Sequence, residues 1–461
     1  MGQLFGTDGV RGIVDKDLTS DLAVKIGTSV SRVLKKNLNK DKLKFIIGSD
    51  TRESKDMFTN AISYGVTEEG CDMINVGVLP TPAIAYLVKL YGLDGAFVVS
   101  ASHNPSEYNG IKVLDKDGFK LSDELEEECE DIILGDFKLD ESIKEKGSFI
   151  NDPTAIEHYI RYLKSTVGEK LKGIKILIDT ANGASYETAD RIFSELGCDY
   201  TIINNNPDGK NINDNAGSTH IEGLQEKVVE GNYDVGIAYD GDADRCILVD
   251  EKGNVIDGDF IIAIIGNELK KEGKLTNNTV VGTIMSNMGL KKFCEEANIN
   301  FVDTKVGDKY VLREMLKENY IIGGEQSGHI IFKELANTGD GELTSLQILN
   351  VMAKENKKLS ELASIMKKYP QKMINVDVTK EGKKAFETRE DIKEVIKSYE
   401  DKIGNRGRVN VRPSGTENLI RVMFEGESKE EIERLCSELA TYISKELGNN
   451  KTYTLKDKNN N

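Results

Sequence analysis

The segment DGDADR, which begins at Asp240, places three carboxylates at alternate positions directly after an apolar run. Asp240, Asp242 and Asp244 would repel one another unless a cation lies between them. A hard divalent metal with oxygen ligands meets that need, and Mg²⁺ commonly accompanies phosphate chemistry. An EF-hand fits less well, because Arg245 stands where that loop needs glycine. A solvated acidic turn, and a phosphatase with Asp240 as nucleophile, stay open here.

A second reactive segment, SASHNP, begins at Ser100 and ends the apolar run AFVV. A serine next to a histidine suggests an activated nucleophile. Side chains adjacent on an extended chain point to opposite faces, so we expect His103 to be poorly placed to take a proton from Ser102. The segment lacks the GxSxG turn of α/β-hydrolases, and the four histidines of the chain leave a Ser-His-Asp triad unsupported but open. We assign His103 to shaping the loop.

Three glycine-containing segments have side chains suited to sugar phosphates. In RPSGTENLIR, glycine lets the backbone approach an anion, and the guanidinium and hydroxyl groups can donate to phosphate oxygens. GGEQSGH combines a carboxylate and a hydroxyl that suit vicinal sugar hydroxyls, and FGTDGVRG adds a basic residue near the start of the chain. The candidate residues in these segments are Arg412, Ser414, Gly415 and Thr416, then Glu325, Ser327 and His329, and finally Arg11.

Strand-like runs alternate with amphipathic segments along most of the chain, which predicts mixed α/β domains. Small polar loops follow several of these strands, and open α/β sheets bind ligands beyond the carboxyl ends of their strands. The last ninety residues or so instead indicate a smaller α+β domain with an antiparallel sheet. We place four domains at residues 1–150, 151–254, 255–368 and 369–461.

Composition narrows the class of protein. A net charge of −17 argues against broad nucleic-acid binding, which needs a basic face. No apolar run approaches the length of a membrane span, and the N-terminal segment has no signal-peptide pattern. The six cysteines form no CxxC pair, so we expect reduced thiols without structural zinc, in a cytoplasmic protein.

Taken together, SASHNP with NGIK, DGDADR, GGEQSGH and RPSGTE occur in an order and spacing that resemble the α-D-phosphohexomutase superfamily over essentially the whole chain. FGTDGVRG, GGEQSGH and VRPSGTE together resemble most the branch that acts on glucosamine phosphate. The resemblance implies four domains around a central cleft. It also implies an isomerase that interconverts glucosamine 6-phosphate and glucosamine 1-phosphate, for amino-sugar and cell-wall precursor synthesis.

The resemblance also implies residue roles. Ser102 matches the serine that carries a phosphoryl group and completes a Mg²⁺ site with the three aspartates, and a sugar 1,6-bisphosphate is the intermediate. Arg412, Ser414, Gly415 and Thr416, assisted by Arg421, match the loop that contacts the phosphate that is not transferred. Glu325 and Ser327 match residues that contact sugar hydroxyls. Arg11, Lys112 and Arg245 match basic residues at the phosphate that is transferred. Lys112 is our candidate for proton transfer. A small phosphosugar is the expected partner, and relatives suggest a homodimer.

Two departures from the family pattern stand out. Ala243 replaces the middle glycine of DGDGDR, and Asn418 stands where proline usually follows RPSGTE. Gly307-Asp308 stands where the phosphomannomutase and phosphoglucomutase branch tends to have Gly-His, which favours glucosamine phosphate. The alternatives are a phosphoglucomutase or phosphomannomutase of the same superfamily, a metal-dependent sugar phosphatase, and a catalytically silent sugar-phosphate-binding protein.

Overall fold

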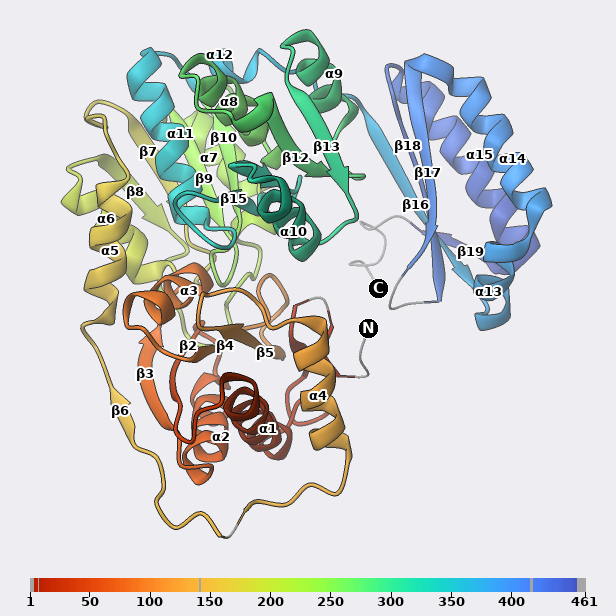
Figure 1. The fold of residues 1–461 in the computed structure, drawn as a ribbon. Helices are drawn as coiled ribbons and strands as arrows, with labels where there is room; N and C mark the ends of the chain where they lie inside the picture. Colours follow the sequence, from red (N-terminus) through yellow and green to blue (C-terminus); the bar gives the residue numbers. More distant parts are fainter. Residues whose placement is uncertain (1–3, 7, 141, 415–417, 454–461) are drawn as a thin grey trace. The chain divides into compact units, whose positions relative to one another are not determined.

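The computed structural model describes residues 4–6, 8–140, 142–414 and 418–453 of the chain (Figure 1). Its internal contacts divide it into two compact units. The first unit contains three sheets, and the second contains residues 287–296 together with the chain from residue 366 onward and the fourth sheet.

The first sheet carries SASHNP at the end of one of its strands. In spatial order its strands are β1 (Val10–Ile13), β5 (Tyr108–Asp115), β4 (Gly95–Val99), β2 (Lys44–Ser49), β3 (Asp72–Val78) and β6 (Phe149–Asn151). Its helices are α1 (Ser20–Leu38), α2 (Lys55–Glu68), α3 (Thr81–Leu90) and α4 (Asp123–Leu134). Helices α1 and α2 cover one face and α3 the other (Figure 1). Gly27 allows α1 and α2 to pack closely, because a Cβ there would lie 2.4 Å from the Ile62 carbonyl oxygen.

The second and third sheets follow in the same unit. The second has β11 (Val255–Ile256), β10 (Cys246–Asp250), β9 (Val235–Tyr239), β7 (Lys175–Asp179) and β8 (Asp199–Ile203), with α5 (Ala155–Ser165), α6 (Tyr186–Glu195) and α7 (Glu222–Glu230). The third has β13 (Asn300–Thr304), β12 (Thr279–Thr283), β14 (Ile322–Gly324) and β15 (Ile330–Phe332), with α8 (Gly258–Lys271), α10 (Asp308–Glu318), α11 (Gly341–Glu355) and α12 (Leu359–Ala363).

The three sheets share one strand order. Each has three parallel strands in the spatial order second, first, third, followed by a fourth, antiparallel strand: β3-β2-β4-β5, β8-β7-β9-β10 and β13-β12-β14-β15. SASHNP, DGDADR and EQSGH occupy the loop between the third and fourth strands of the first, second and third sheets. The predicted repetition of α/β units with polar loops at strand ends is therefore confirmed.

The second unit is built differently. Its sheet, β17 (Gly407–Pro413), β18 (Leu419–Gly426), β16 (Gln371–Val378) and β19 (Gly448–Tyr453), is antiparallel throughout. Its helices are α9 (Met288–Glu296), α13 (Lys380–Thr388), α14 (Glu390–Ile403) and α15 (Lys429–Leu447). The apolar face of α15 packs on the sheet through Leu435, Leu439 and Ile443, all fully buried. The predicted α+β region is confirmed.

None of the six cysteines forms a disulfide bond, and each is buried except Cys198, which is half-buried. Among the described residues, no helix combines the length and the apolar character that a membrane crossing requires.

Candidate metal and phosphoryl-transfer site

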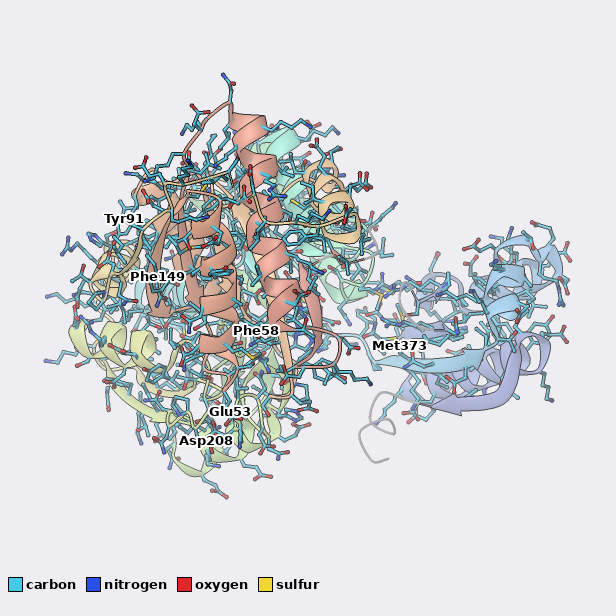
Figure 2. The ribbon with its side chains drawn as sticks, turned by 90° about the horizontal axis from the view of Figure 1, so that it is seen from below. Glu53, Phe58, Tyr91, Phe149, Asp208 and Met373 are labelled. Atoms are coloured by element: carbon cyan, nitrogen blue, oxygen red, sulfur yellow. The ribbon has the colours of Figure 1, made fainter. Side chains whose placement is uncertain are left out.

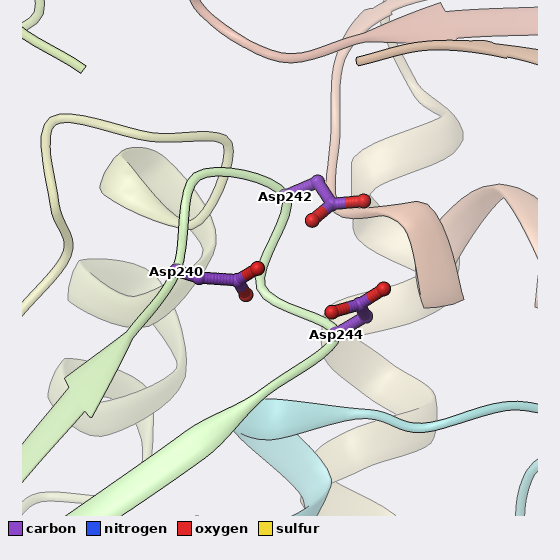
Figure 3. A group of neighbouring side chains, drawn as sticks. All are labelled: Asp240, Asp242 and Asp244. Atoms are coloured by element: carbon purple, nitrogen blue, oxygen red, sulfur yellow. The ribbon is translucent and has the colours of Figure 1, made fainter. Parts of the chain in front are cut away.

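Three carboxylates converge in the loop between β9 and β10 (Figure 3). One oxygen from each of Asp240, Asp242 and Asp244 lies within 4.8 Å of the others, and all three residues are buried. Atom Oδ1 of Asp242 and Oδ1 of Asp244 are buried without a hydrogen-bond partner among the described residues. Buried polar atoms are normally satisfied, so these oxygens fit a cation, and the cluster is a candidate metal site. The flanking elements are strands, which an EF-hand does not have.

Asp240 and Asp242 differ in the direction of their pKa shifts. Burial and the neighbouring Asp244 and Asp242 raise the pKa of Asp240 well above its usual range. Burial would also raise the pKa of Asp242, but the Lys112 ammonium group 2.7 Å away lowers it well below its ordinary value. Without a metal, the ionised form of Asp240 is therefore disfavoured, and a cation between the carboxylates would favour it.

Ser102 lies against this cluster. Its backbone adopts the left-handed region at φ 52°, although it is not glycine. Its Oγ donates a hydrogen bond to Oδ2 of Asp240 at 2.7 Å, and the side chain is buried. The backbone N–H of Ser102 donates to Oγ of Ser100 at 2.9 Å, and Ser100 in turn donates to Asp50 at 2.6 Å. The first two sheets thus bring the candidate nucleophile and the candidate metal ligands together.

The position predicted for His103 was wrong. Its Nδ1 lies 3.3 Å from Oγ of Ser102, because the left-handed backbone of the serine breaks the extended geometry that would separate adjacent side chains. Burial, followed by the charges of Arg245 and Arg11, lowers the pKa of His103 to about 3. The ring is close to the hydroxyl but is a weak proton acceptor.

Lys112 projects from β5 into the acidic cluster. Its Nζ lies 2.7 Å from Asp242, 3.2 Å from Asp8 and 3.4 Å from Asp244. Although burial lowers the pKa of Lys112, these carboxylates raise it well above the ordinary value, so the group carries a proton here. Arg11, on the adjacent strand β1, forms an ion pair with Asp8.

Residues that sequence reasoning missed extend this network. Lys120 bridges Asp8 at 2.6 Å and Asp308, the first residue of α10, at 2.7 Å. Thr81, the first residue of α3, donates to Oδ2 of Asp242 at 2.5 Å. A cavity of about 300 Å³ opens beside these groups, and Lys112, Lys120, Thr81, Asp244 and Asp308 are among its lining residues. This volume is at the lower end of small-molecule sites.

The sugar-loop candidates lie between β14 and β15, in the same unit. Oε1 of Glu325 accepts a hydrogen bond from the Gly307 backbone N–H at 2.9 Å. Burial lowers the pKa of Arg245, but the charges of nearby carboxylates, Glu325 among them, raise it above its ordinary value. Nε2 of His329 accepts from the Gly339 N–H at 3.2 Å and lies 3.7 Å from Asp308. Ser327 is exposed. A backbone hydrogen bond of 3.0 Å from Cys246 to the Gly328 carbonyl joins this loop to β10, directly after DGDADR.

The segment TGDG at the start of α11 supports the metal loop from the other side. Gly341 N–H donates to the Ala243 carbonyl at 2.9 Å, and a Cβ at Gly341 would lie 2.4 Å from the Arg245 carbonyl oxygen. Ala243, the departure from the family pattern, has a left-handed φ of 56°. That conformation explains why glycine suits this position.

The remaining candidates belong to the second unit. Arg412 on β17 pairs directly with Arg421 on β18, and neither has an ion-pair partner among the described residues. Ser414 is buried, and its N–H donates to the Leu419 carbonyl at 2.9 Å. Gly415 and Thr416 lie outside the described residues.

The chain matches four domain models in order. They are described as phosphoglucomutase/phosphomannomutase alpha/beta/alpha domains I, II and III and the C-terminal domain, and they match residues 2–139, 157–253, 257–369 and 373–441. The "Phosphoglucosamine mutase" of Clostridium botulinum is 50% identical over 452 residues, which cover 97% of this chain and 100% of that protein.

Two further relatives agree with this match. The "Phosphoglucosamine mutase" of Clostridium novyi is 51% identical over 445 residues, covering 96% of this chain and 99% of that protein. A solved phosphoglucomutase/phosphomannomutase family protein from Burkholderia thailandensis has the same fold, with a TM-score of 0.80 at 20% identity over 96% of this chain and 98% of that chain. The chain therefore belongs to the phosphohexomutase family, in its phosphoglucosamine mutase branch.

Proposed function

We propose that this phosphohexomutase interconverts glucosamine 6-phosphate and glucosamine 1-phosphate by way of a phosphoryl group carried on Ser102. The observation that carries the proposal is the hydrogen bond of 2.7 Å from the Ser102 hydroxyl to Asp240, within a buried cluster of three carboxylates. Phosphoryl transfer needs positioning and charge neutralisation more than covalent assistance.

Asp240, Asp242 and Asp244 would hold Mg²⁺, with an oxygen of the phosphorylated Ser102 completing the site. When bound, Mg²⁺ neutralises negative charge on the phosphoryl group. The unpartnered buried oxygens of Asp242 and Asp244 support this assignment.

In the first step, the bond from phosphorus to Oγ of Ser102 breaks and a bond from phosphorus to a sugar hydroxyl oxygen forms. The product is a sugar 1,6-bisphosphate, which returns its other phosphate to Ser102 in the reverse chemistry. Lys112 is the proposed proton carrier: it gives its proton to Oγ when the phosphoryl group leaves, and it takes up the proton that the attacking sugar hydroxyl releases. Its buried, charged state beside three carboxylates supports the donor half of that role. Arg11 and Arg245 supply further positive charge.

The other loops would bind the rest of the substrate. Glu325, Ser327 and His329 would contact sugar hydroxyls, and the facing pair Arg412 and Arg421, with Ser414, Gly415 and Thr416, would hold the phosphate that is not being transferred. His103 would shape the serine loop. Four domains divided near residues 150, 254 and 368 around a central cleft, a homodimer and a cytoplasmic location remain predictions of the same proposal.

A coupled assay tests the proposal. Purified enzyme is primed with a hexose 1,6-bisphosphate in Mg²⁺ and offered glucosamine, glucose and mannose 6-phosphates in parallel. We expect the highest kcat/KM with glucosamine 6-phosphate, and a fall of at least a thousandfold in Ser102→Ala, with Ser106→Ala as the control from the same loop. Intact mass should show one phosphate on the wild type and none on Ser102→Ala. Release of inorganic phosphate without isomerisation would instead identify a phosphatase.

A further inference from the structure

Two side chains far from each other in the sequence donate hydrogen bonds to the same two carbonyl oxygens of the loop that contains Ser102, the serine loop. Nη2 of Arg52 donates to the Ser102 carbonyl at 3.1 Å and to the Asn104 carbonyl at 2.7 Å. Nδ2 of Asn213 donates to the same oxygens, at 2.9 Å and 3.1 Å. Arg52 follows β2 of the first sheet and Asn213 follows β8 of the second, so these hydrogen bonds come from both domains.

Arg52 is committed entirely to this loop and to Asp50. The side chain has no exposed surface. Its Nη1 donates to the carbonyls of Pro105 and Tyr108, and its Nε donates to Oδ2 of Asp50 at 3.0 Å. Every N–H of the planar guanidinium group therefore has an acceptor. Lysine cannot reproduce that set of bonds, because a single ammonium group offers three donors from one point.

The Asn213 side chain also meets the metal loop. A Cβ at Gly241, inside DGDADR, would lie 2.5 Å from the Ser102 carbonyl oxygen and 2.8 Å from Nδ2 of Asn213. The bare backbone of Gly241 thus packs on the carbonyl that both side chains hold. Ser102 and Asp240 are brought to hydrogen-bond distance at this junction.

Further contacts join the loop of Arg52 to two loops of the second domain, those after β7 and after β8. The backbone N–H of Glu53 donates to the Gly209 carbonyl at 2.9 Å, and Oγ1 of Thr51 donates to the Asn182 carbonyl at 2.5 Å. Figure 2 shows Glu53 and Asp208 near each other on their two loops. Arg52 and Asn213 are therefore held by a continuous interface.

We infer that Arg52 and Asn213 form a carbonyl clamp that holds Ser102 in its left-handed conformation and so aims its hydroxyl at Asp240. A residue with a Cβ rarely adopts φ 52°, and the four hydrogen bonds to the Ser102 and Asn104 carbonyls hold the chain on both sides of His103 in place. Both are positioning residues, since their hydrogen bonds to the serine loop go to backbone oxygens and not to the reacting hydroxyl. The catalytic consequence rests on the proposed function of Ser102, but the clamp itself does not.

Asn213→Gly is the sharpest variant. Asn213 itself has a left-handed φ of 59°, so glycine removes the amide without straining the backbone. Asn215→Gly is the matched control, because Asn215 is exposed and also left-handed at φ 49°. With the Mg²⁺-loaded full chain, we expect kcat to fall about tenfold in Asn213→Gly while KM for glucosamine 6-phosphate changes less than twofold.

Hydrogen–deuterium exchange gives a readout that does not depend on activity. Peptides covering residues 100–108 should exchange faster in Asn213→Gly than in Asn215→Gly, with global unfolding unchanged. Arg52→Lys should show the same pattern against Arg32→Lys. Equal exchange in the two asparagine variants overturns the clamp, and faster exchange with unchanged kcat overturns its catalytic consequence. If the wild type shows no mutase turnover but the exchange contrast persists, the proposed function fails and the clamp stands.

Discussion

Arg412 lies directly opposite Arg421 in the antiparallel pair β17–β18, so two guanidinium groups share one face of the sheet. Burial, followed by the charge of Arg421, lowers the pKa of Arg412. Like charges placed opposite each other destabilise a sheet, and an anion bound between them would relieve that repulsion, as the proposed phosphate contact requires. This pair is the strongest feature of the second unit that points to phosphate.

Removing the charge of Arg412 should therefore weaken substrate binding without lowering the stability of the folded protein. Charge-assisted hydrogen bonds to phosphate contribute about 1.5–3 kcal/mol, so Arg412→Gln should raise KM for glucosamine 6-phosphate at least tenfold. The melting temperature should stay equal or rise, because a repulsive pair is lost. Arg406→Gln is the control, since Arg406 is exposed and pairs with Glu431. A variant with normal KM would contradict a role in phosphate binding.

Metal affinity should depend on Asp242 more than on nearby acids outside the cluster. Asp242→Asn removes a ligand charge, and we expect Mg²⁺ affinity measured by calorimetry to fall at least tenfold. Chelation of the wild type should abolish turnover, and added Mg²⁺ should restore it. Asp214→Asn, on the exposed part of a nearby loop, should bind Mg²⁺ as the wild type does. Turnover that is indifferent to chelation would refute the metal site.

The alternation of apolar runs was enough to predict most of the sheets. The apolar runs LKFIIGSD (43–50) and MINVGVLP (73–80) predict strands and contain most of β2 and β3, and the charged run KEEIERLCSELATYISKEL predicts a helix with the bounds of α15, Lys429–Leu447. Strands β1 and β5 were missed, because glycines interrupt VRGI and YNGIKVLD. Each is stabilised by pairing with the other, Val10 opposite Ile111, and such long-range pairing leaves little trace in a local pattern.

The candidate site was predictable where the functional side chains lie together in one short sequence motif. Asp8 and Asp308 lie within the motif segments, but the ion pairs that each forms with Lys120 join residues 112 and 188 positions apart along the chain. Arg52 and Asn213 act through backbone oxygens, so no pattern of reactive side chains marks them. Polar residues directly after buried strands, such as Thr51 and Arg52, are the signal that could have found them.

His103 should contribute little as a base. With a pKa lowered to about 3, the ring stays neutral from pH 5 to pH 9. The pH profiles of kcat for the wild type and for a His103 variant should therefore have the same inflections in this range. His103→Gln should retain more than a tenth of wild-type kcat. A loss as large as that of Ser102→Ala would restore the histidine as an essential proton acceptor.

Ala243→Gly should stabilise the protein. A left-handed alanine costs about 1–2 kcal/mol, of which the greater flexibility of unfolded glycine cancels part, so we expect a gain of about 1 kcal/mol in the free energy of unfolding. Ala184→Gly is the matched control: it is buried in the same domain without a left-handed φ, and it should be destabilised. Urea unfolding measures both. Equal losses in the two variants would show that the Ala243 methyl group is held by packing instead.

Asp340 should make stability depend on pH. Burial raises the pKa of this carboxyl, which caps α11 and accepts a hydrogen bond of 2.9 Å from the Tyr159 hydroxyl, to about 6. Its stabilising contribution is fully present below the unfolded pKa near 4 and is lost as pH rises through about 6, because the unfolded chain ionises first. The difference in unfolding free energy between Asp340→Asn and the wild type should therefore rise by up to about 3 kcal/mol between pH 4 and pH 7.

Asp190→Asn, at an exposed acid, should leave that difference flat across the same range. The comparison cancels the titration of groups that do not interact with Asp340, so it reports on this carboxyl and on its coupling to the neighbouring Glu342. A difference that falls with pH would mean that Asp340 is ionised and stabilising in the folded protein, and that a cation absent from its described contacts lies close to it.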